Sequence, residues 1–173
     1  MSPFGPFFCV FRWDLSQIDA SKSQSSGSIR VKDAADGEYG TVAEVWYKGL
    51  ASEEGNAWSD YLARWTPVKA AKWFLDYKNR FEAKVLVAEE DDAIIGISGI
   101  IPEKKSGIAR MYTGVVVATD QRRKGVGSIL LYTTLLESKR QGLHYSEVET
   151  RPGITASKYL YHKFGGIEKL VSA

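Results

Sequence analysis

The sequence predicts one α/β domain, and three observations support this prediction. The chain has 173 residues, which is close to the common size of a domain with its own core. Apolar residues recur at helical spacing between about residues 36 and 81, and shorter strand-like runs follow them. Two of these runs are joined by a short acidic turn, which is typical of an antiparallel hairpin. After the runs, helical and strand segments alternate to the end of the chain.

Residues 1–28 are expected to form a flexible extension outside a folded domain at residues 29–173. Residues 16–28 are rich in Ser, Lys, Gln and Gly, which bury little apolar surface and are typical of a linker. The preceding stretch, MSPFGPFFCVFRW, lacks an early basic cluster and a small-residue cleavage site. We therefore expect neither a signal peptide nor a membrane span there. Its aromatic side chains offer an alternative, docking on a partner or on the domain itself: Phe4, Phe7, Phe8 and Phe11.

The first half of the domain is expected to be a short strand followed by helices. The strand candidate covers residues 29–32, and Val42, Val45 and Trp46 then recur at the spacing of a helix over about 36–49. A second helical region covers about 58–81, interrupted where Pro67 removes a backbone donor. Most of its aromatic rings are expected to be core. The apolar face is formed by Leu62 together with the aromatic residues Trp58, Tyr61, Trp65, Trp73, Phe74 and Tyr77.

The second half is expected to contain most of the sheet. Two hairpin strands are predicted at 84–89 and 93–101, and a longer strand at 108–118 carries a continuous apolar run that indicates burial on both faces. An amphipathic helix is predicted from Gly125 to just before Gly142. The last predicted elements are a strand at 144–150, a helix at 156–164 and a strand at 167–171.

Composition limits the possible function. The 23 basic and 21 acidic residues leave a net charge of +2, which argues against a protein that mainly neutralises nucleic-acid phosphates. The single cysteine, Cys9, can form no internal disulfide, and its distance in sequence from His144 and His162 gives no zinc pattern. A reducing, cytoplasmic setting without a bound metal fits this composition best.

The stretch VVVATDQRRKGVGSILL runs from a buried strand through a basic, glycine-containing turn into a helix. The first turn of a helix has N–H groups without intrahelical partners and a positive dipole end, so it can hold phosphate oxygens. Gly125 and Gly127 allow the backbone to approach a phosphate closely. The turn lacks the endings of the nucleotide-triphosphate loop and of the dinucleotide fingerprint. A hydroxyl and local positive charge complete the predicted phosphate site: Ser128, Arg122, Arg123 and Lys124.

This turn resembles the Gln/Arg-x-x-Gly-x-Gly/Ala element of the Gcn5-related N-acetyltransferases (GNAT), with Arg122, Gly125 and Gly127 in register, and the element order matches over about residues 29–171. The resemblance implies a mixed, mostly antiparallel central sheet with helices on both faces and a splayed strand pair that forms the acetyl-CoA cleft. It implies that Val115, Val116 and Val117 bind pantetheine through their backbone. It also implies that the pyrophosphate is wrapped by Arg122, Arg123, Lys124, Gly125, Val126, Gly127 and Ser128.

A second match, ASKYLYHKFGG, resembles the family's Ala-x-x-Leu-Tyr-x-x-x-Gly-Phe segment. The resemblance implies that Tyr161 is the general acid, because a phenol near the leaving sulfur can protonate the thiolate; Tyr159 is the second choice. Gly153 and Gly166 stand where many relatives have Asn and Phe. These departures favour the alternative function, a module that binds acetyl-CoA or a protein without catalysis.

An amine attacks only when it is neutral, which a lysine-like amine is in roughly one molecule in 2,500 at pH 7. A general base is therefore expected, and Glu147 and Glu149 share one face of the strand before Tyr161 because side chains alternate along a strand. Both are also compatible with solvent-facing carboxylates. His144 and His162 are more typical of surface histidines.

The first two helices are expected to select the amine acceptor. Their connection carries acidic and aromatic residues that could recognise a cation by charge and by cation–π contact: Glu53, Glu54, Trp58, Asp60 and Tyr61. Polyamine, peptide α-amine, protein lysine and aminoglycoside all remain open as acceptors, and the chain could be a monomer or a homodimer. No nucleic-acid or membrane partner is expected.

Overall fold

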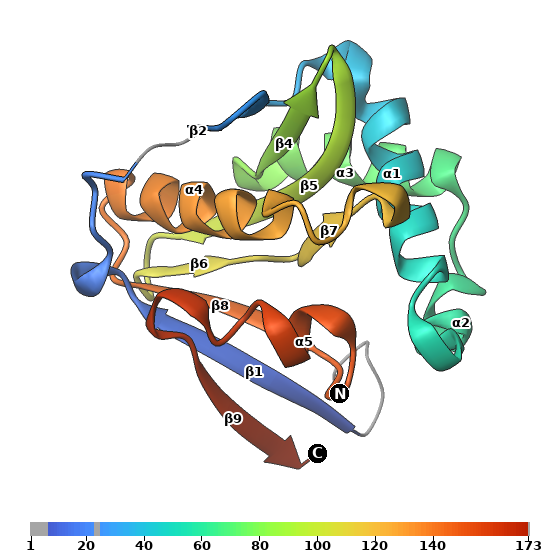
Figure 1. Cartoon of the computed structure of the whole chain (residues 1–173). Coiled ribbons are helices and arrows are strands. Elements are labelled where there is room, and N and C mark those ends of the chain that lie inside the picture. The colour runs from blue at the N-terminus through green and yellow to red at the C-terminus, as the bar shows by residue number, and fades with distance from the viewer. Residues whose placement is uncertain (1–6, 23–24, 173) are drawn as a thin grey trace.

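The structure, a computed structural model, describes residues 7–22 and 25–172. Along the described chain, three strands precede the first three helices, four strands follow them, and helices and strands alternate only from the fourth helix onward (Figure 1). The helices are α1 (Tyr39–Ala51), α2 (Ser59–Leu62), α3 (Pro67–Phe81), α4 (Val126–Arg140) and α5 (Thr155–Tyr159). The strands are β1 (Phe7–Asp14), β2 (Ser25–Ser26), β3 (Ile29–Asp33), β4 (Lys84–Glu90), β5 (Ala93–Glu103), β6 (Ile108–Arg110), β7 (Val115–Val117), β8 (Tyr145–Thr150) and β9 (Ile167–Ser172).

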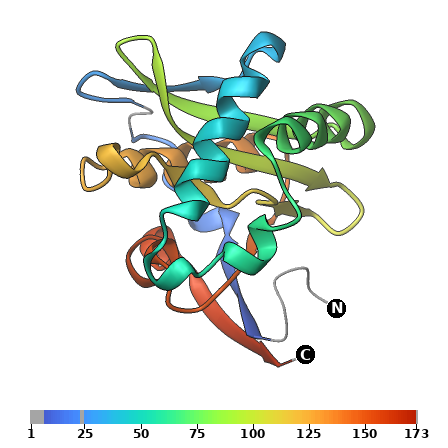
Figure 2. The ribbon, with the colours of Figure 1, turned by 90° about the vertical axis from the view of Figure 1, so that its right-hand side faces the viewer.

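The described strands form one sheet in the order β2-β3-β4-β5-β6-β8-β1-β9, with β7 paired to β5 beside this path. The pairings are antiparallel except that of β6 with β8, which is parallel. Helices α1, α2 and α3 pack on one face around an aromatic core that includes Trp46 and Phe74, and α4 and α5 lie over the other face (Figures 1 and 2). The predicted fold class, a mostly antiparallel sheet with helices on both faces, is confirmed.

Local sequence explains where the elements begin and end. Thr66 caps α3, its side chain accepting a hydrogen bond from the Lys69 N–H, and Pro67 occupies the first helical turn, where its missing N–H costs nothing. The acidic turn predicted between the two hairpin strands joins β4 to β5, with Asp91 and Asp92 in left-handed conformations. Asp tolerates this conformation better than most residues, so the hairpin forms where the sequence predicts it.

The strand predicted over residues 108–118 is two strands. The chain leaves the β6 pairing after Arg110 and turns at Gly114, which has a φ of 65°, before it pairs again with β5 as β7. Strand β8 pairs with β6 but not with β7 among the described pairings, so β7 and β8 diverge. This divergence is the splayed strand pair that the sequence analysis anticipated, produced by a glycine turn rather than by one continuous strand.

The prediction that residues 1–28 form a flexible extension outside the domain is wrong for the described residues. Strand β1 lies between β8 and β9, where Phe11 pairs with Val148 on one side and Glu168 on the other. Its alternate side chains Cys9, Phe11 and Trp13 are fully buried. Residues 7–14 are therefore part of the domain, which does not start at residue 29. Composition misled here because the polar linker signal of 16–28 was extended to the apolar segment before it; Phe4 lies outside the described residues.

The C-terminal helix is shorter than predicted. Helix α5 ends at Tyr159, and a 3₁₀ turn at Lys163–Gly165 replaces its second half. The turn leads to Gly166, where a Cβ atom would lie 1.9 Å from the Tyr161 carbonyl oxygen and 2.7 Å from Trp13 Nε1. A larger side chain at 166 is therefore excluded first by the Tyr161 carbonyl oxygen and then by Trp13 of β1, which accounts for the glycine at this position.

Candidate functional site

A cleft with a volume of about 770 Å³ opens where β7 and β8 diverge. Its walls come from β7, from the turn and first residues of α4, and from α5, and the α1–α2 connection closes one end. Such a volume is within the range of small-molecule sites. The cleft contains most of the predicted cofactor-binding residues: Val115, Val116, Val117, Arg122, Arg123, Gly125, Val126, Gly127 and Ser128.

The start of α4 forms an anion site in this cleft. Gly125 is the N-cap, with a φ of 81° that favours glycine, and no side chain caps the helix. The first intrahelical bond is donated by the Ile129 N–H to the Gly125 carbonyl oxygen. The amides before Ile129 therefore lack helical partners and lie at the positive end of the helix dipole. Lys163 Nζ donates to Ser128 Oγ at 2.7 Å, so a second positive charge borders the same site.

The basic residues of the turn have different roles. Arg122 turns its guanidinium toward the end of α1, where Nη2 donates to the Gly49 carbonyl oxygen at 3.0 Å and to Ser52 Oγ at 3.1 Å. Lys124 does not line the cleft and donates to Gln121 Oε1 at 2.9 Å. Arg123 lines the cleft. Arg122 thus holds the turn against α1, and Arg123 is the better placed guanidinium for an anion.

Strand β7 has one hydrogen-bonded neighbour among the described strands, because Val115–Val117 pair with Ser98–Gly96 of β5. Its other edge faces the cleft. Backbone donors and acceptors of a strand edge that is left without a partner strand can pair with an extended ligand. Val115 and Val116 are buried, and Val117 is partly exposed.

A smaller cavity of about 30 Å³ adjoins the cleft on the side of α1 and α2. Five residues line both spaces: Leu50, Trp58, Val115, Val116 and Ile154. The inner cavity also contacts the candidate acid Tyr161 and the candidate base Glu149. The two candidate proton-transfer groups therefore meet at the same space, next to the first residues of β7.

Tyr161 is buried under β1, with 1% of its surface exposed. Its ring packs on Phe11 and Trp13, and its Oη accepts a hydrogen bond from the Val115 N–H at 2.9 Å. Among the described residues, the structure gives its hydroxyl proton no acceptor. Burial raises the pKa of Tyr161 well above the usual tyrosine value, against the lowering effect of the Val115 amide. Tyr161 is therefore a protonated phenol at neutral pH.

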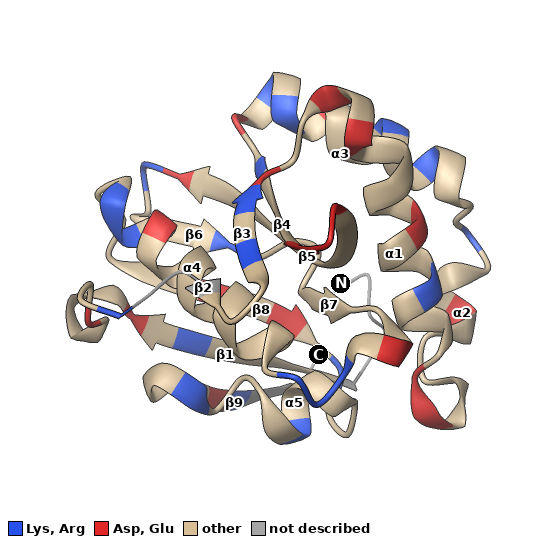
Figure 3. Ribbon diagram, turned by 45° about the horizontal axis from the view of Figure 1, so that its top comes forward, with Lys and Arg blue, Asp and Glu red and all other residues tan. Residues whose placement is uncertain are grey.

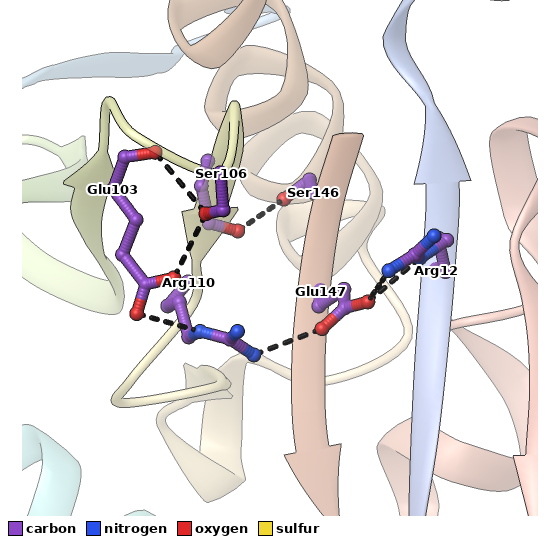
Figure 4. A network of polar contacts seen from close by, with 7 residues as sticks. Arg12, Glu103, Ser106, Arg110, Ser146 and Glu147 are labelled. Carbon is purple, nitrogen blue, oxygen red and sulfur yellow. Dashed lines mark hydrogen bonds and ion pairs between the residues drawn. The ribbon is translucent and has the colours of Figure 1, made fainter. Parts of the chain in front are cut away.

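The two candidate bases lie in different environments. Glu147 accepts a hydrogen bond from Arg12 Nε at 2.6 Å and one from Arg110 Nη1 at 2.9 Å, and Arg110 continues the network to Glu103 (Figure 4). Glu147 lines neither cavity. Glu149, two residues further along the same face of β8, lines the inner cavity. The structure therefore does not support Glu147 as a base, because two arginines already hold its carboxylate.

The remaining tyrosine and histidine candidates lie outside the inner cavity. Tyr159 is 72% exposed and lines only the outer cleft. His144 packs near Gly107, and His162 packs edge-on against Phe11 and lies 3.9 Å from Glu168. Neither histidine lines either cavity.

Two of the predicted acceptor-recognition carboxylates, Glu53 before α2 and Asp60 within α2, bond to other parts of the protein, whereas Glu54 lines the outer cleft. Glu53 accepts hydrogen bonds from the Thr155 N–H and hydroxyl at the start of α5. Asp60 forms a two-pronged ion pair with Arg151 at 2.7 and 3.0 Å, and the Arg151 guanidinium lies 4.8 Å above the Trp58 ring. Glu53 and Asp60 thus fix the walls of the site, and the expectation that they recognise a cation directly is not supported.

Sequence reasoning missed two lysines of the outer cleft, Lys158 and Lys163. No signal in the sequence marks them, because lysines on a short helix are usually solvated. The overall charge pattern gives no further guide, since Figure 3 shows Lys and Arg interspersed with Asp and Glu over the helices and strands, with stretches of one sign in some turns. Within the described residues no helix is long and apolar enough to span a bilayer, and no group of three potential metal ligands is found.

Residues 82–165 match the profile of the acetyltransferase (GNAT) domain. No curated protein sequence matches the chain. The fold is similar to that of a Salmonella typhimurium protein whose structure contains its cofactor acetyl-CoA (19% identity, 80% of this chain and 79% of that chain, TM-score 0.64). It is also similar to a PaiA N-acetyltransferase from Thermoplasma acidophilum in complex with coenzyme A (15% identity, covering 84% of this chain and 100% of that chain, TM-score 0.65). A third similar structure is that of a ribosomal-protein-alanine N-acetyltransferase from Brucella melitensis (19% identity, covering 82% of this chain and 99% of that chain, TM-score 0.62).

Proposed function

Because the chain contains a GNAT acetyltransferase domain, matched over residues 82–165, we propose that it is an acetyl-CoA-dependent N-acetyltransferase. It transfers an acetyl group to a primary amine by direct attack of the amine on the thioester. Two cavities that meet at Val115 and Val116 carry this proposal: the outer one contains an anion site, and the inner one contains an acid and a base.

The outer cleft suits coenzyme A in size and charge. The unpaired amides at the start of α4 would bind the pyrophosphate, with Arg123, Lys158 and Lys163 adding positive charge around it. The cleft-facing edge of β7 would pair with the amide groups of the pantetheine arm, apart from the Val115 N–H and the Val117 carbonyl oxygen, which already bond to Tyr161 Oη and Arg122 Nε. The thioester would then lie at the junction of the two cavities, because the arm follows β7 from α4 toward Val115.

Tyr161 is the proposed general acid. Its Oη is fixed at the Val115 N–H, where the thioester sulfur would lie, and its raised pKa keeps the proton available at neutral pH. A thiolate leaves more easily when a proton is donated to it as the carbon–sulfur bond breaks. The phenolate that remains regains its proton from solvent after the products leave.

Glu149 is the proposed general base. An alkylammonium ion entering the inner cavity loses a proton to this carboxylate, directly or through one water molecule, and the neutral nitrogen attacks the acetyl carbon. A carbon–nitrogen bond forms, the carbon–sulfur bond breaks as Tyr161 protonates the sulfur, and the attached nitrogen gives its second proton to water. The products are an N-acetyl amine, free coenzyme A and one released proton once Glu149 and Tyr161 have returned to their starting protonation states. Glu147 is not assigned this role, because its carboxylate is held by Arg12 and Arg110.

Thiol release from acetyl-CoA in the presence of a panel of primary amines tests the proposal, together with calorimetric titration of coenzyme A. Coenzyme A binding and amine-dependent thiol release support it. Binding without release on any amine favours the alternative, a module that holds acetyl-CoA without chemistry. Absence of binding contradicts both. The cytoplasmic location is a prediction from composition, and the chain is proposed to be either a monomer or a homodimer.

A further inference from the structure

The inner cavity is narrow. Its volume of about 30 Å³ compares with the 10–15 Å³ that one water-sized group needs, so it holds roughly two such groups. A nitrogen and the carbon attached to it fill this space, and the rest of an unbranched chain extends out through the cavity's opening, because the cavity is only partly enclosed. A branch on that carbon adds a third group, for which the cavity has no room unless a wall moves.

The cavity walls combine aromatic rings with one negative charge. Trp46, Trp58 and Tyr61 line the cavity on the side of the helices. Of the described residues in its wall, Glu149 carries the charge. Aromatic faces and a carboxylate both favour an alkylammonium ion over a neutral or anionic group. The nearby charges of Arg151 and Asp60 compensate each other in their ion pair.

Trp58 stands between the two cavities and is held firmly. It is 4% exposed, and its ring meets Tyr61 edge-on at 5.7 Å and lies under the Arg151 guanidinium at 4.8 Å. Arg151 is anchored in turn by Asp60 and by the Ala57 carbonyl oxygen. Trp58 therefore cannot swing aside without breaking the contacts that join α2 to the end of β8.

We propose that the inner cavity selects unbranched primary alkylamines, bound as cations, and that Trp58 is the residue that excludes branching beside the nitrogen. This inference rests on the proposed function and specifies its acceptor. The class includes the side chain of lysine and the ends of polyamines, whereas an α-amine on a substituted carbon lies outside it.

n-Butylamine and sec-butylamine are the probes, because they share composition and charge and differ only in branching. The parent protein is expected to acetylate n-butylamine with a kcat/KM at least about tenfold higher, the lower end of what one misplaced methyl group costs in a tight pocket. Trp58→Leu is expected to bring the ratio toward one by raising the rate with sec-butylamine. Trp65→Leu is the matched control and keeps the parent's ratio, because Trp65 packs on Trp46 and Tyr61 but lines neither cavity.

The ratio in the parent protein tests the inference without any substitution, so a variant that fails to fold leaves the test intact. Equal rates for the two isomers overturn the inference and leave the proposed function standing. The same holds if n-butylamine is inert while another amine of the panel is acetylated. Failure of every amine to release thiol from bound acetyl-CoA overturns the proposed function itself.

Discussion

Tyr161 Oη accepts the Val115 N–H at 2.9 Å, which ties the segment after α5 to the first residue of β7. The bond holds the phenol in the wall of the inner cavity, beside Val115, which lines both cavities. Because the oxygen is occupied as an acceptor, its O–H remains to donate. The contact therefore leaves the phenol of this fully buried tyrosine able to donate its proton, as its proposed role as general acid requires.

Substitution of Gly127 separates helix stability from phosphate binding. Gly127→Asp places a carboxylate in the first turn of α4, where the helix dipole stabilises it by about 0.3–1 kcal/mol, yet the charge repels a pyrophosphate. A built Cβ lies 3.4 Å from Leu160, so the side chain fits. Calorimetry is expected to show that Gly127→Asp binds coenzyme A at least about tenfold more weakly than Gly127→Asn does. The unfolding midpoint of Gly127→Asp is expected to be no lower than that of Gly127→Asn. Equal affinities would contradict an anion site at this helix.

Replacement of Glu149 is expected to affect acceptors according to their basicity. Glu149→Gln removes the group that takes the ammonium proton, and such bases typically contribute about 10²–10⁴ in rate. The loss in kcat/KM is expected to be larger for n-butylamine than for trifluoroethylamine, which is mostly neutral at pH 7. Steady-state thiol release at a fixed pH measures both.

Glu147→Gln is the matched control for this prediction. It removes a carboxylate from the same face of β8 but breaks ion pairs with Arg12 and Arg110. Its kcat/KM is expected to stay near the parent's value while the free energy of unfolding falls. A larger activity loss in Glu147→Gln than in Glu149→Gln would exchange the assigned roles.

Cys9 gives a pH dependence of stability. Burial, together with the nearby Glu168 carboxylate, raises the pKa of its thiol from 9.0 to about 11. Between these values the unfolded chain releases the proton first, so the thiol's contribution is complete below pH 9 and is lost as pH rises toward 11. The difference in unfolding free energy between the parent and Cys9→Ala is expected to shrink over this range. A difference that does not change with pH would contradict the buried thiol.

Phe11 tests whether the N-terminal segment belongs to the core. It is fully buried on β1 and packs against Tyr161 and Trp13. Phe11→Ala is expected to lower the free energy of unfolding, measured by urea denaturation, by about 3–5 kcal/mol, as other truncations of large core side chains do. Val10→Ala, at a partly exposed position on the opposite face of the strand, is expected to cost less than half as much. If residues 7–14 were an appendage, neither substitution would alter the unfolding free energy.

The elements that the sequence predicted best are those that local chemistry determines. The β4–β5 hairpin follows from its acidic turn, and α3 from Thr66 and Pro67 at its start. The glycine turn that starts α4 was also predictable, because Gly125 takes the left-handed conformation at its N-cap; phosphate binding by this turn stays a prediction. These features depend on neighbours in sequence, which single-sequence reasoning can see.

The features that were missed depend on contacts between distant residues. Strand β1 is a strand because β8 and β9 flank it, more than 130 positions away, and Gly166 is small because Trp13 lies against it. The choice between Glu147 and Glu149 likewise follows from Arg12 on β1. Period-two spacing placed both carboxylates on one face correctly, but it carried no information about which of them an arginine would hold.

The most direct test is Tyr161→Phe, measured as kcat for thiol release with a good amine acceptor and as coenzyme A affinity in the same preparation. The phenyl ring keeps the packing on Phe11 and Trp13 and loses only the hydroxyl. We predict that kcat falls by a factor of about 10²–10⁴ and that coenzyme A binding is retained. Tyr145→Phe, at an exposed position on β8, is the control variant and is expected to keep the parent's kcat. A kcat for Tyr161→Phe within about twofold of the parent's would contradict the assignment of Tyr161 as the acid and with it the mechanism.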